Sequence, residues 1–235
     1  MKQIEYTYKD QQNVHVIQAK VSQNSKIGIG YIIQTYHYSI DQVTQGDITL
    51  DKNNCLDCPF SFNQNDGKSG GCYTHKGMQF MGIKSMLKRL NKNYESICEF
   101  NQTEFDAFVE SVKNQYPVDL VRFGAYGEPV LLGEKITSVL SDLGKKQTGY
   151  THQYRNQGFN WSKDYFMAST HNLAEMLTAT RLGFRNFTSI DKDQTVEGVN
   201  CPASKESGLN LSCVKCGLCN GKKTNIQKDI FILKH

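Results

Sequence analysis

The chain has few arginines, one tryptophan and four prolines, and it has no long apolar run. No segment approaches the roughly 20 apolar residues that span a bilayer, so no membrane association is expected. The sequence also contains no P-loop, no HExxH zinc motif and no pattern typical of a nucleophilic triad. The function classes that depend on these motifs are therefore excluded.

No secretory signal is expected either, because the residues from Met1 to Tyr8 contain no apolar core. We therefore expect a cytoplasmic location. In a reducing cytoplasm, closely spaced cysteines are more often metal or redox sites than disulfides. The net charge of +4 permits contact with nucleic acid without requiring it.

The spacing of the cysteines is the most informative feature of the sequence. Seven of the eight fall into two groups. The first cysteine group is Cys55, Cys58 and Cys72, and the second cysteine group is Cys201, Cys213, Cys216 and Cys219. Thiols at i and i+3 can wrap one inorganic centre, because the two intervening residues turn the backbone around it. The spacing therefore predicts a metalloprotein.

The second cysteine group offers four thiolates, enough to close a coordination sphere. A closed sphere leaves no position for substrate, so this centre is expected to be structural or to transfer electrons. The CxxCxxC run, together with a Cys-Pro step at Cys201, favours a [4Fe–4S] cluster. Zinc is the alternative.

The first cysteine group leaves two schemes open. If His75 joins it, three thiolates and one imidazole form a structural zinc knuckle. If His75 stays outside as a surface residue, one coordination position remains open and catalysis becomes feasible. The eighth cysteine, Cys98, follows Ile97 in an apolar neighbourhood, which predicts a small core residue.

Strand and helix patterns alternate along most of the chain. A helix with a buried apolar stripe is expected after a cap at Asn101 or Thr103. Further helices are predicted at 78–90, 131–143 and 172–182, and strands at 118–125, 147–151, 165–169, 184–190, 199–201 and 226–233. This alternation predicts an α/β fold, namely an incomplete (β/α) barrel of parallel strands over residues 1–200. Residues 201–235 are expected to form a C-terminal metal-binding segment packed on it.

Small or polar residues follow several of the predicted strands at their C-terminal ends. They are Gly127, Glu128, Thr151, His152 and Ser169. In α/β barrels the loops at these ends converge on one axis, so these residues are predicted to bind a cofactor. For Glu128 the alternative is an acid that stabilises a helix N-terminus.

Two further features have alternative interpretations. Arg122 lies in a strand that is predicted to be buried, so it either pairs with an acid such as Asp119 or Glu128 or binds an anion. The structural pair is the favoured interpretation. The aromatic and basic segment 150–155, with Trp161 beyond it, could stack nucleobases or pack in the interior.

The order of these parts resembles that of the radical S-adenosylmethionine enzymes, in which a three-cysteine loop follows the first barrel strand and a Gly-Gly-Glu-Pro motif ends the second. Here Gly127-Glu128-Pro129 occupies the place of that motif, with Tyr126 in place of the first glycine. The resemblance implies a [4Fe–4S] cluster on the first cysteine group and S-adenosylmethionine beside residues 124–128. The two gaps between the cysteines, of two and thirteen residues, depart from the family's tighter spacing.

The chain is also similar to gene product 88-like proteins of phages and plasmids. The similarity rests on Cys-x-x-Cys…Gly-Cys-Tyr (55–73), Arg-Phe-Gly…Gly-Glu (122–128), Gly-Tyr-Thr-His (149–152), Met-Ala-Ser (167–169) and Cys-Pro-Ala-Ser-Lys (201–205). This resemblance implies a phage or mobile-element protein acting in the host cytoplasm, and it implies no particular activity.

Two functional hypotheses follow. The first is an iron–sulfur protein with one or two [4Fe–4S] clusters, radical S-adenosylmethionine-like, acting on an unknown substrate. The second is a zinc-binding, non-catalytic protein that binds nucleic acid in replication or host takeover.

Overall fold

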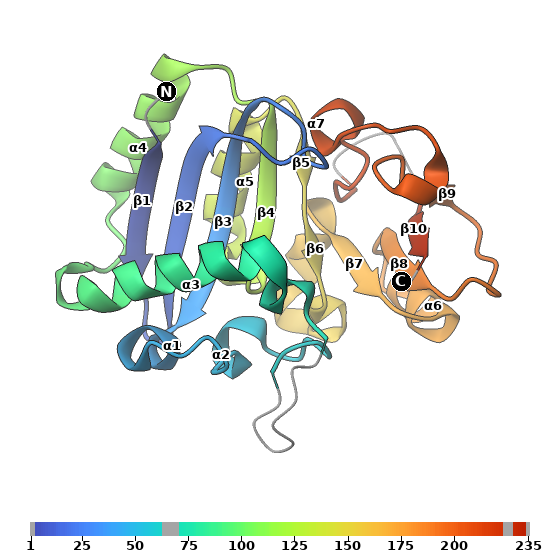
Figure 1. Cartoon of the computed structure of the whole chain (residues 1–235), viewed down its shortest axis with the longest axis horizontal. Coiled ribbons are helices and arrows are strands. Elements are labelled where there is room, and N and C mark those ends of the chain that lie inside the picture. Colours follow the sequence, from blue (N-terminus) through green and yellow to red (C-terminus); the bar gives the residue numbers. More distant parts are fainter. Residues whose placement is uncertain (1–2, 63–70, 223–227, 234–235) are drawn as a thin grey trace.

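The computed structural model describes residues 3–62, 71–222 and 228–233, and it has an α/β architecture built on two sheets (Figure 1). The first sheet has the strand order β1-β2-β3-β4-β5, and the second has the order β6-β7-β8-β10-β9. Within the described residues no ladder joins β1 to β9, so the sheets do not close into a barrel. The predicted α/β class is confirmed, in the form of two open sheets.

The elements follow the predicted alternation closely. The strands are β1 (Ile4–Lys9), β2 (Asn13–Val21), β3 (Tyr31–Ser39), β4 (Leu120–Tyr126), β5 (Gln147–Thr148), β6 (Tyr150–Thr151), β7 (Met167–Thr170), β8 (Asn186–Ile190), β9 (Val199–Asn200) and β10 (Ile230–Leu233). The α-helices are α1 (Ile40–Gln45), α2 (Lys52–Cys55), α3 (Gly77–Lys92), α4 (Gln102–Gln115), α5 (Gly133–Leu143), α6 (Leu173–Arg181) and α7 (Cys213–Cys216). The helices predicted at 78–90, 131–143 and 172–182 correspond to α3, α5 and α6.

The first sheet is mixed, which corrects the prediction of parallel strands throughout. β1, β2 and β3 form antiparallel pairs, whereas β3, β4 and β5 are parallel. β1 and β2 are joined by a short turn in which the Asp10 carboxylate accepts hydrogen bonds from the backbone N–H groups of Gln12 and Asn13, at 2.8 and 2.7 Å. A link this short can only reverse the chain, because parallel strands need a long crossover.

The second sheet is entirely parallel, and the strand β10 lies between β8 and β9. The two sheets meet at one extended segment, residues 147–151, which pairs with β4 through β5 and with β7 through β6. Gly149 interrupts this segment. A Cβ there would lie 2.5 Å from the Phe166 ring, so only glycine permits the close approach.

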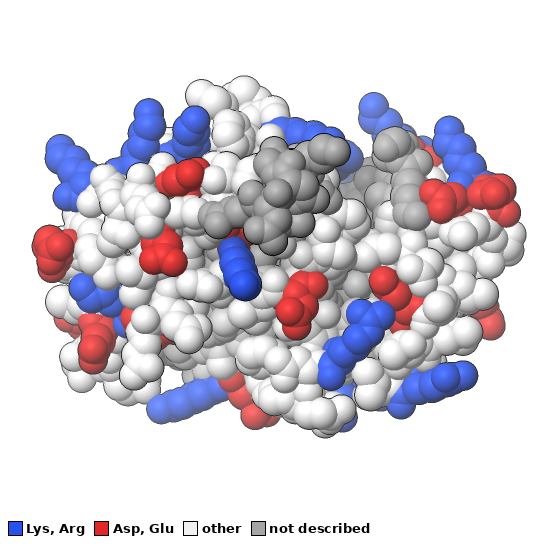
Figure 2. All heavy atoms as spheres, turned by 90° about the horizontal axis from the view of Figure 1, so that it is seen from below, with Lys and Arg blue, Asp and Glu red and all other residues white. Residues whose placement is uncertain are grey.

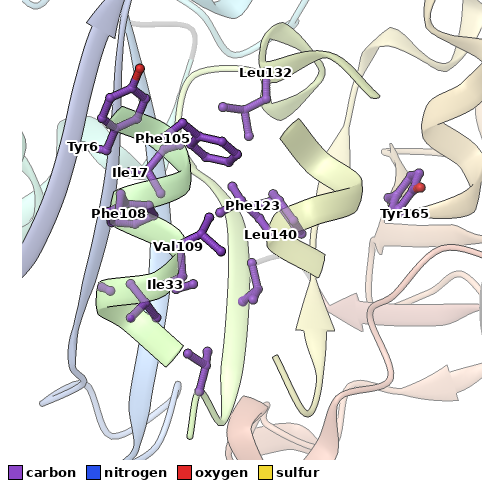
Figure 3. Packing of buried hydrophobic residues seen from close by; sticks show 14 of the residues in the cluster. Tyr6, Ile17, Ile33, Phe105, Phe108, Val109, Phe123, Leu132, Leu140 and Tyr165 are labelled. Carbon is purple, nitrogen blue, oxygen red and sulfur yellow. The ribbon is translucent and has the colours of Figure 1, made fainter. Parts of the chain in front are cut away.

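One face of the first sheet is covered by α4 and α5 (Figure 3). Asn101 caps α4, as predicted, by accepting a 3.1 Å hydrogen bond from the backbone N–H of Glu104. The buried stripe of α4 packs in one cluster with Ile17, Ile33 and Phe123 of the sheet. This stripe, predicted from the sequence, consists of Phe105, Phe108, Val109 and Val112.

The helix α3 crosses the opposite face of the first sheet (Figure 1). Its buried side chains Ile83, Leu87 and Leu90 pack against Val14 and Val16 of β2. The first sheet is therefore sandwiched between helices, and the short helices α1 and α2 lie at the C-terminal end of β3 (Figure 1). None of the described helices is long and apolar enough to cross a membrane.

Candidate metal centre

The first cysteine group begins where α2 is anchored to the turn after β4. The backbone N–H of Glu128 donates to the Asn54 carbonyl at 2.7 Å, and the Asn54 side chain donates to the His37 carbonyl at 2.9 Å. Gly127 has a φ of +77°, and a Cβ there would lie 2.8 Å from His37, so this position requires glycine. These contacts hold Cys55, the last residue of α2, beside the strand ends.

Three side chains of metal-ligand type converge at this place. The candidate ligand atoms of Cys58, Glu128 and His152 all lie within 4.8 Å of one another. His152 Nδ1 is 2.9 Å from Glu128 Oε1, and His152 Nε2 is 3.9 Å from the Cys58 sulfur. A tetrahedral metal bonded to a sulfur and a nitrogen places those two atoms roughly 3.5 Å apart. The geometry is thus close to what a bound metal needs.

Glu128 holds this histidine in place. Its carboxylate is 3% exposed and accepts hydrogen bonds from Thr151 Oγ1 at 2.7 Å and from the backbone N–H of His152 at 3.1 Å. Metal-binding histidines commonly bond a carboxylate through one ring nitrogen, which aims the other nitrogen at the metal. His152 has this arrangement, with Nε2 directed toward Cys58.

The electrostatics of His152 favour a positive charge between the thiol and the carboxylate. Burial alone disfavours a charged imidazole, but hydrogen bonds with Cys58 and Glu128 outweigh burial and raise the pKa of His152 to about 10. A metal cation bound between the same groups meets the same electrostatic requirement.

The three thiols of the first cysteine group lie close enough to influence one another's ionisation. Burial raises the pKa of Cys55 well above its usual range, and negative charge at Asp51, Cys58 and Cys72 raises it further. Burial also raises the pKa of Cys72, against its hydrogen bonds with Thr74. None of the described cysteines forms a disulfide. Buried thiolates in one site need a cation, so this donor set fits a metal or a cluster.

A buried carboxylate that the sequence analysis missed anchors the loop of this group. Asp51 Oδ1 accepts hydrogen bonds from Gln42 Nε2 and the Tyr126 hydroxyl, both at 3.0 Å, and Oδ2 accepts from the backbone N–H of Phe62 at 3.0 Å. His75 Nε2 lies 3.4 Å from Asp51 Oδ2. The predicted alternatives for this histidine were a zinc ligand and a surface residue, and the structure places it against a buried acid.

The second cysteine group is presented by one helical turn. Cys213 and Cys216 begin and end α7, so their side chains share one side of the turn. The backbone N–H groups of Cys213 and Val214 donate to the carbonyls of Lys26 and Ile27 at 3.0 and 2.8 Å. α7 is thereby attached to the loop before β3, whereas the first cysteine group is attached near the end of β3.

The four thiols of the second group also influence one another. Burial raises the pKa of Cys219, a hydrogen bond with Tyr150 opposes this rise, and negative charge at Cys201, Cys213 and Cys216 adds to it. Among the described residues, no three of these sulfurs lie within 4.8 Å of one another. Zinc bonded at about 2.3 Å needs sulfurs roughly 3.8 Å apart, so the structure does not assemble a single-ion site here.

A buried arginine that the sequence analysis did not single out fixes the loop of the second group. Arg185 is 3% exposed and donates hydrogen bonds to the carbonyls of Leu218, Asn220, Gly221 and Lys228 at 2.5–3.2 Å. Charge-assisted bonds of this kind are among the strongest that a protein makes. They clamp the chain on both sides of residues 223–227.

The structure brings together some of the residues that follow the predicted strands and leaves others apart. Thr151 and His152 lie together with Glu128, which was expected from the convergence of strand ends. Ser169 has no described contact with these residues. His171, two residues later, stacks on His152 with ring centroids 5.4 Å apart.

The expected ion pair of Arg122 is absent from the described residues. Asp119 binds Lys145 at 2.9 Å, and Glu128 is engaged by Thr151 and His152. Arg122 Nη2 instead lies 3.3 Å from the Tyr73 hydroxyl, directly after the last residue of the first cysteine group. The favoured structural pair is therefore wrong, and the alternative of anion binding remains.

Two other predictions concern residues outside the cysteine groups. Cys98 is exposed, so the prediction of a core residue is wrong; Ile97 occupies the interior, and the next side chain faces solvent. In the aromatic and basic segment, Tyr154 is buried and Trp161 packs against Phe166 with ring centroids 6.0 Å apart. These two rings serve packing rather than an exposed stacking surface.

The chain matches no protein-family model, no curated protein and no solved structure. A function for this chain therefore rests on the chemistry of its own residues.

Proposed function

We propose that this chain is an iron–sulfur protein of the radical S-adenosylmethionine type. The observation that carries the proposal is the convergence of Cys58, Glu128 and His152, beside the other thiols of the first cysteine group, at the C-terminal ends of β4 and β6. In α/β proteins these strand ends are where catalytic and cofactor-binding residues gather.

The residues of the first group have distinct roles in this proposal. Cys55, Cys58 and Cys72 hold a [4Fe–4S] cluster, and the turn at Gly127 and Glu128 lies where the family binds its cofactor. When bound, such a cluster supplies single electrons to the cofactor. Glu128 orients the His152 ring beside the thiols, because its carboxylate binds both the backbone N–H and the Nδ1 of His152.

The second cysteine group holds an auxiliary cluster in the same proposal. Its four thiolates leave no coordination position open, and its loops are fixed by backbone hydrogen bonds and by Arg185. A centre of this kind stabilises the fold or passes electrons. The CxxCxxC run, together with the Cys-Pro step at Cys201, supports a cluster over zinc.

A second candidate is a zinc site in which Cys58 Sγ and His152 Nε2 bind the ion and Glu128 orients the imidazole through Nδ1. The 3.9 Å between the sulfur and Nε2 favours it, because it approaches the separation of two ligands of one tetrahedral ion. A role in nucleic-acid binding has less support. Acidic and basic side chains are interspersed on the face that Figure 2 shows.

Metal and sulfide analysis of protein purified without oxygen tests the proposal. We expect iron and acid-labile sulfide in the wild-type protein, with Cys58→Ser and Cys216→Ser each losing about half of both. Cys98→Ser is the matched control, because this thiol is exposed and lies outside both groups. It should retain the full content.

Two results would contradict this proposal. Stoichiometric zinc without sulfide, lost in Cys58→Ser and His152→Ala, would establish the second candidate instead. A wild-type protein that is folded and holds neither iron nor zinc would exclude both.

A further inference from the structure

A cationic cleft lies between α3 and the first sheet. Its volume is about 940 Å³, which is in the size range of small-molecule binding sites. Its lining includes Lys20, Arg89 and Arg122, and among the described residues it includes no aspartate or glutamate. No cysteine lines it, although Arg122 at one end of the cleft also interacts electrostatically with Cys213 of the second cysteine group.

The floor of this cleft crosses a row of polar residues in register. Glu5 pairs with Gln18, Gln18 with Gln34, Gln34 with Arg122, and Arg122 with Thr148. Paired residues on neighbouring strands project to the same side of a sheet, and their Cβ atoms lie roughly 5 Å apart. Gln18 and Gln34 are each less than a tenth exposed. This side of the sheet therefore carries a buried polar row that folding alone does not require.

The charges along this row are not balanced. At one end, Arg89 of α3 binds the Glu5 carboxylate with two hydrogen bonds of 2.7 and 2.8 Å, and Gln18 donates to the same carboxylate at 2.8 Å. Glu5 is thus satisfied, and Arg89 is neutralised. Of the three cations that line the cleft, Lys20 and Arg122 have no described carboxylate within 4.0 Å.

The hydrogen-bond partners of both cations are neutral. Lys20 Nζ lies 3.2 Å from Gln18 Oε1 and 3.4 Å from the Tyr36 hydroxyl, and burial lowers the pKa of Lys20, against the charge of Glu5. Arg122 has the Tyr73 hydroxyl at 3.3 Å and, at longer range, the Cys213 thiol. A partly buried cation without an acid is costly, and an anionic ligand removes that cost.

We propose that this cleft binds a small polyanion, a molecule bearing phosphate or several carboxylates, held between Lys20 and Arg122. The two unpaired cations match at least two negative charges. The Gln34 amide lies beside Arg122 on the neighbouring strand and offers further hydrogen bonds to the same ligand.

Calorimetric titration of the protein as isolated, at low ionic strength, tests this site. The probes are pyrophosphate, a nucleoside diphosphate and citrate, with the uncharged nucleoside as a control. We expect at least one polyanion to bind with millimolar affinity or better and the nucleoside not to bind. Lys20→Gln and Arg122→Gln should each weaken binding at least about tenfold, because each removes a charge-assisted contact. Phosphate and carboxylate ligands are distinguished by which probe binds.

Lys113→Gln is the matched control, because it removes a cation from α4 on the opposite side of the first sheet. It should bind like the wild type. If Arg122→Gln fails to fold, Lys20→Gln decides the outcome. Absence of binding by all three polyanions, or unchanged affinity in the folded variants, would overturn the proposal. Iron and zinc are measured in the same samples, so loss of anion binding with full metal content separates this site from the metal centres.

Discussion

The two cysteine groups differ in what surrounds their thiols. The first lies among side chains that can change charge, with the carboxylates of Asp51 and Glu128 and the imidazole of His152 close to the sulfurs. The second has cations and a phenol near its sulfurs, namely Arg122, Lys26 and Tyr150, and Arg185 holds carbonyl groups of its loop. Acids near the first group and cations near the second are consistent with the different roles proposed for the two centres.

The largest effect is expected for Arg185→Met in the second group. Removing the guanidinium leaves several buried carbonyls without donors, which should lower the free energy of unfolding by roughly 3–5 kcal/mol. Urea denaturation of the isolated protein measures the change. Arg181→Met is the control, since that side chain is exposed at the end of α6 and should change stability little. A similar loss in both variants would contradict a specific clamp.

A smaller effect is expected for Gly127→Ala in the first group. Gly127 and Gly46 have similar φ, +77° and +68°, but only at Gly127 would a Cβ meet neighbouring atoms. Gly46→Ala, at the left-handed residue after α1, should therefore cost about 1 kcal/mol of stability, and Gly127→Ala about 1–3 kcal/mol more. Thermal unfolding compares the pair. Equal costs would show that the turn does not need its close approach to His37.

Glu128→Gln should act on the metal rather than on the fold. The amide keeps the size of the side chain but holds His152 less firmly. In the zinc candidate, where His152 is a ligand, the zinc affinity of the first group should therefore fall about 10–100-fold. Competition with a chelator measures this affinity. The measurement uses protein that also carries Cys216→Ser, so that the second centre does not contribute. Glu134→Gln, at the exposed start of α5, serves as the control. Unchanged affinity in Glu128→Gln would remove His152 from the first centre.

The smallest effect concerns a network beneath the first group that has no counterpart in the second. Asp10 Oδ2 lies 2.8 Å from His15 Nε2, and His15 Nδ1 lies 2.9 Å from His37 Nδ1. Burial of Asp10 opposes ionisation, but the hydrogen bond with His15 outweighs burial and lowers the pKa of Asp10 to about 2.

The sign of the resulting pH dependence follows from that shift. Because the folded pKa lies below the ordinary value of 3.8, the contribution is complete above about pH 4 and is lost as the pH falls toward 2. Asp10→Asn should remove this part of the acid dependence of stability. Denaturation series at several acidic pH values compare the two proteins. Identical curves would show that the network contributes nothing.

The sequence predicts local features well and distant partners poorly. The cap at Asn101 and the buried stripe of α4 are encoded within one helix, so periodicity finds them. The convergence of Glu128 with His152 could be predicted from the sequence, because both follow strands that end at the same edge. The contact between Cys58 and His152 joins residues 94 positions apart, and no local pattern encodes it.

The other residues that the sequence analysis missed also depend on contacts between distant parts of the chain. Asp51 is held by Gln42 and Tyr126, which approach it only after β3 and β4 are aligned. Arg185 looks like an ordinary residue before β8 until the loop of the second group folds over it. Register between strands, rather than composition, creates both sites, as it also creates the polar row beside Arg122.

Electron paramagnetic resonance of the two single-group proteins, Cys216→Ser and Cys58→Ser, tests the contrast between the groups most directly. Each reduced protein is examined with and without S-adenosylmethionine. We predict a cluster signal in both, changed by the cofactor only in Cys216→Ser, where the first group remains. A cofactor effect confined to Cys58→Ser, or no cluster signal in either protein, would contradict an open first centre and a closed second one.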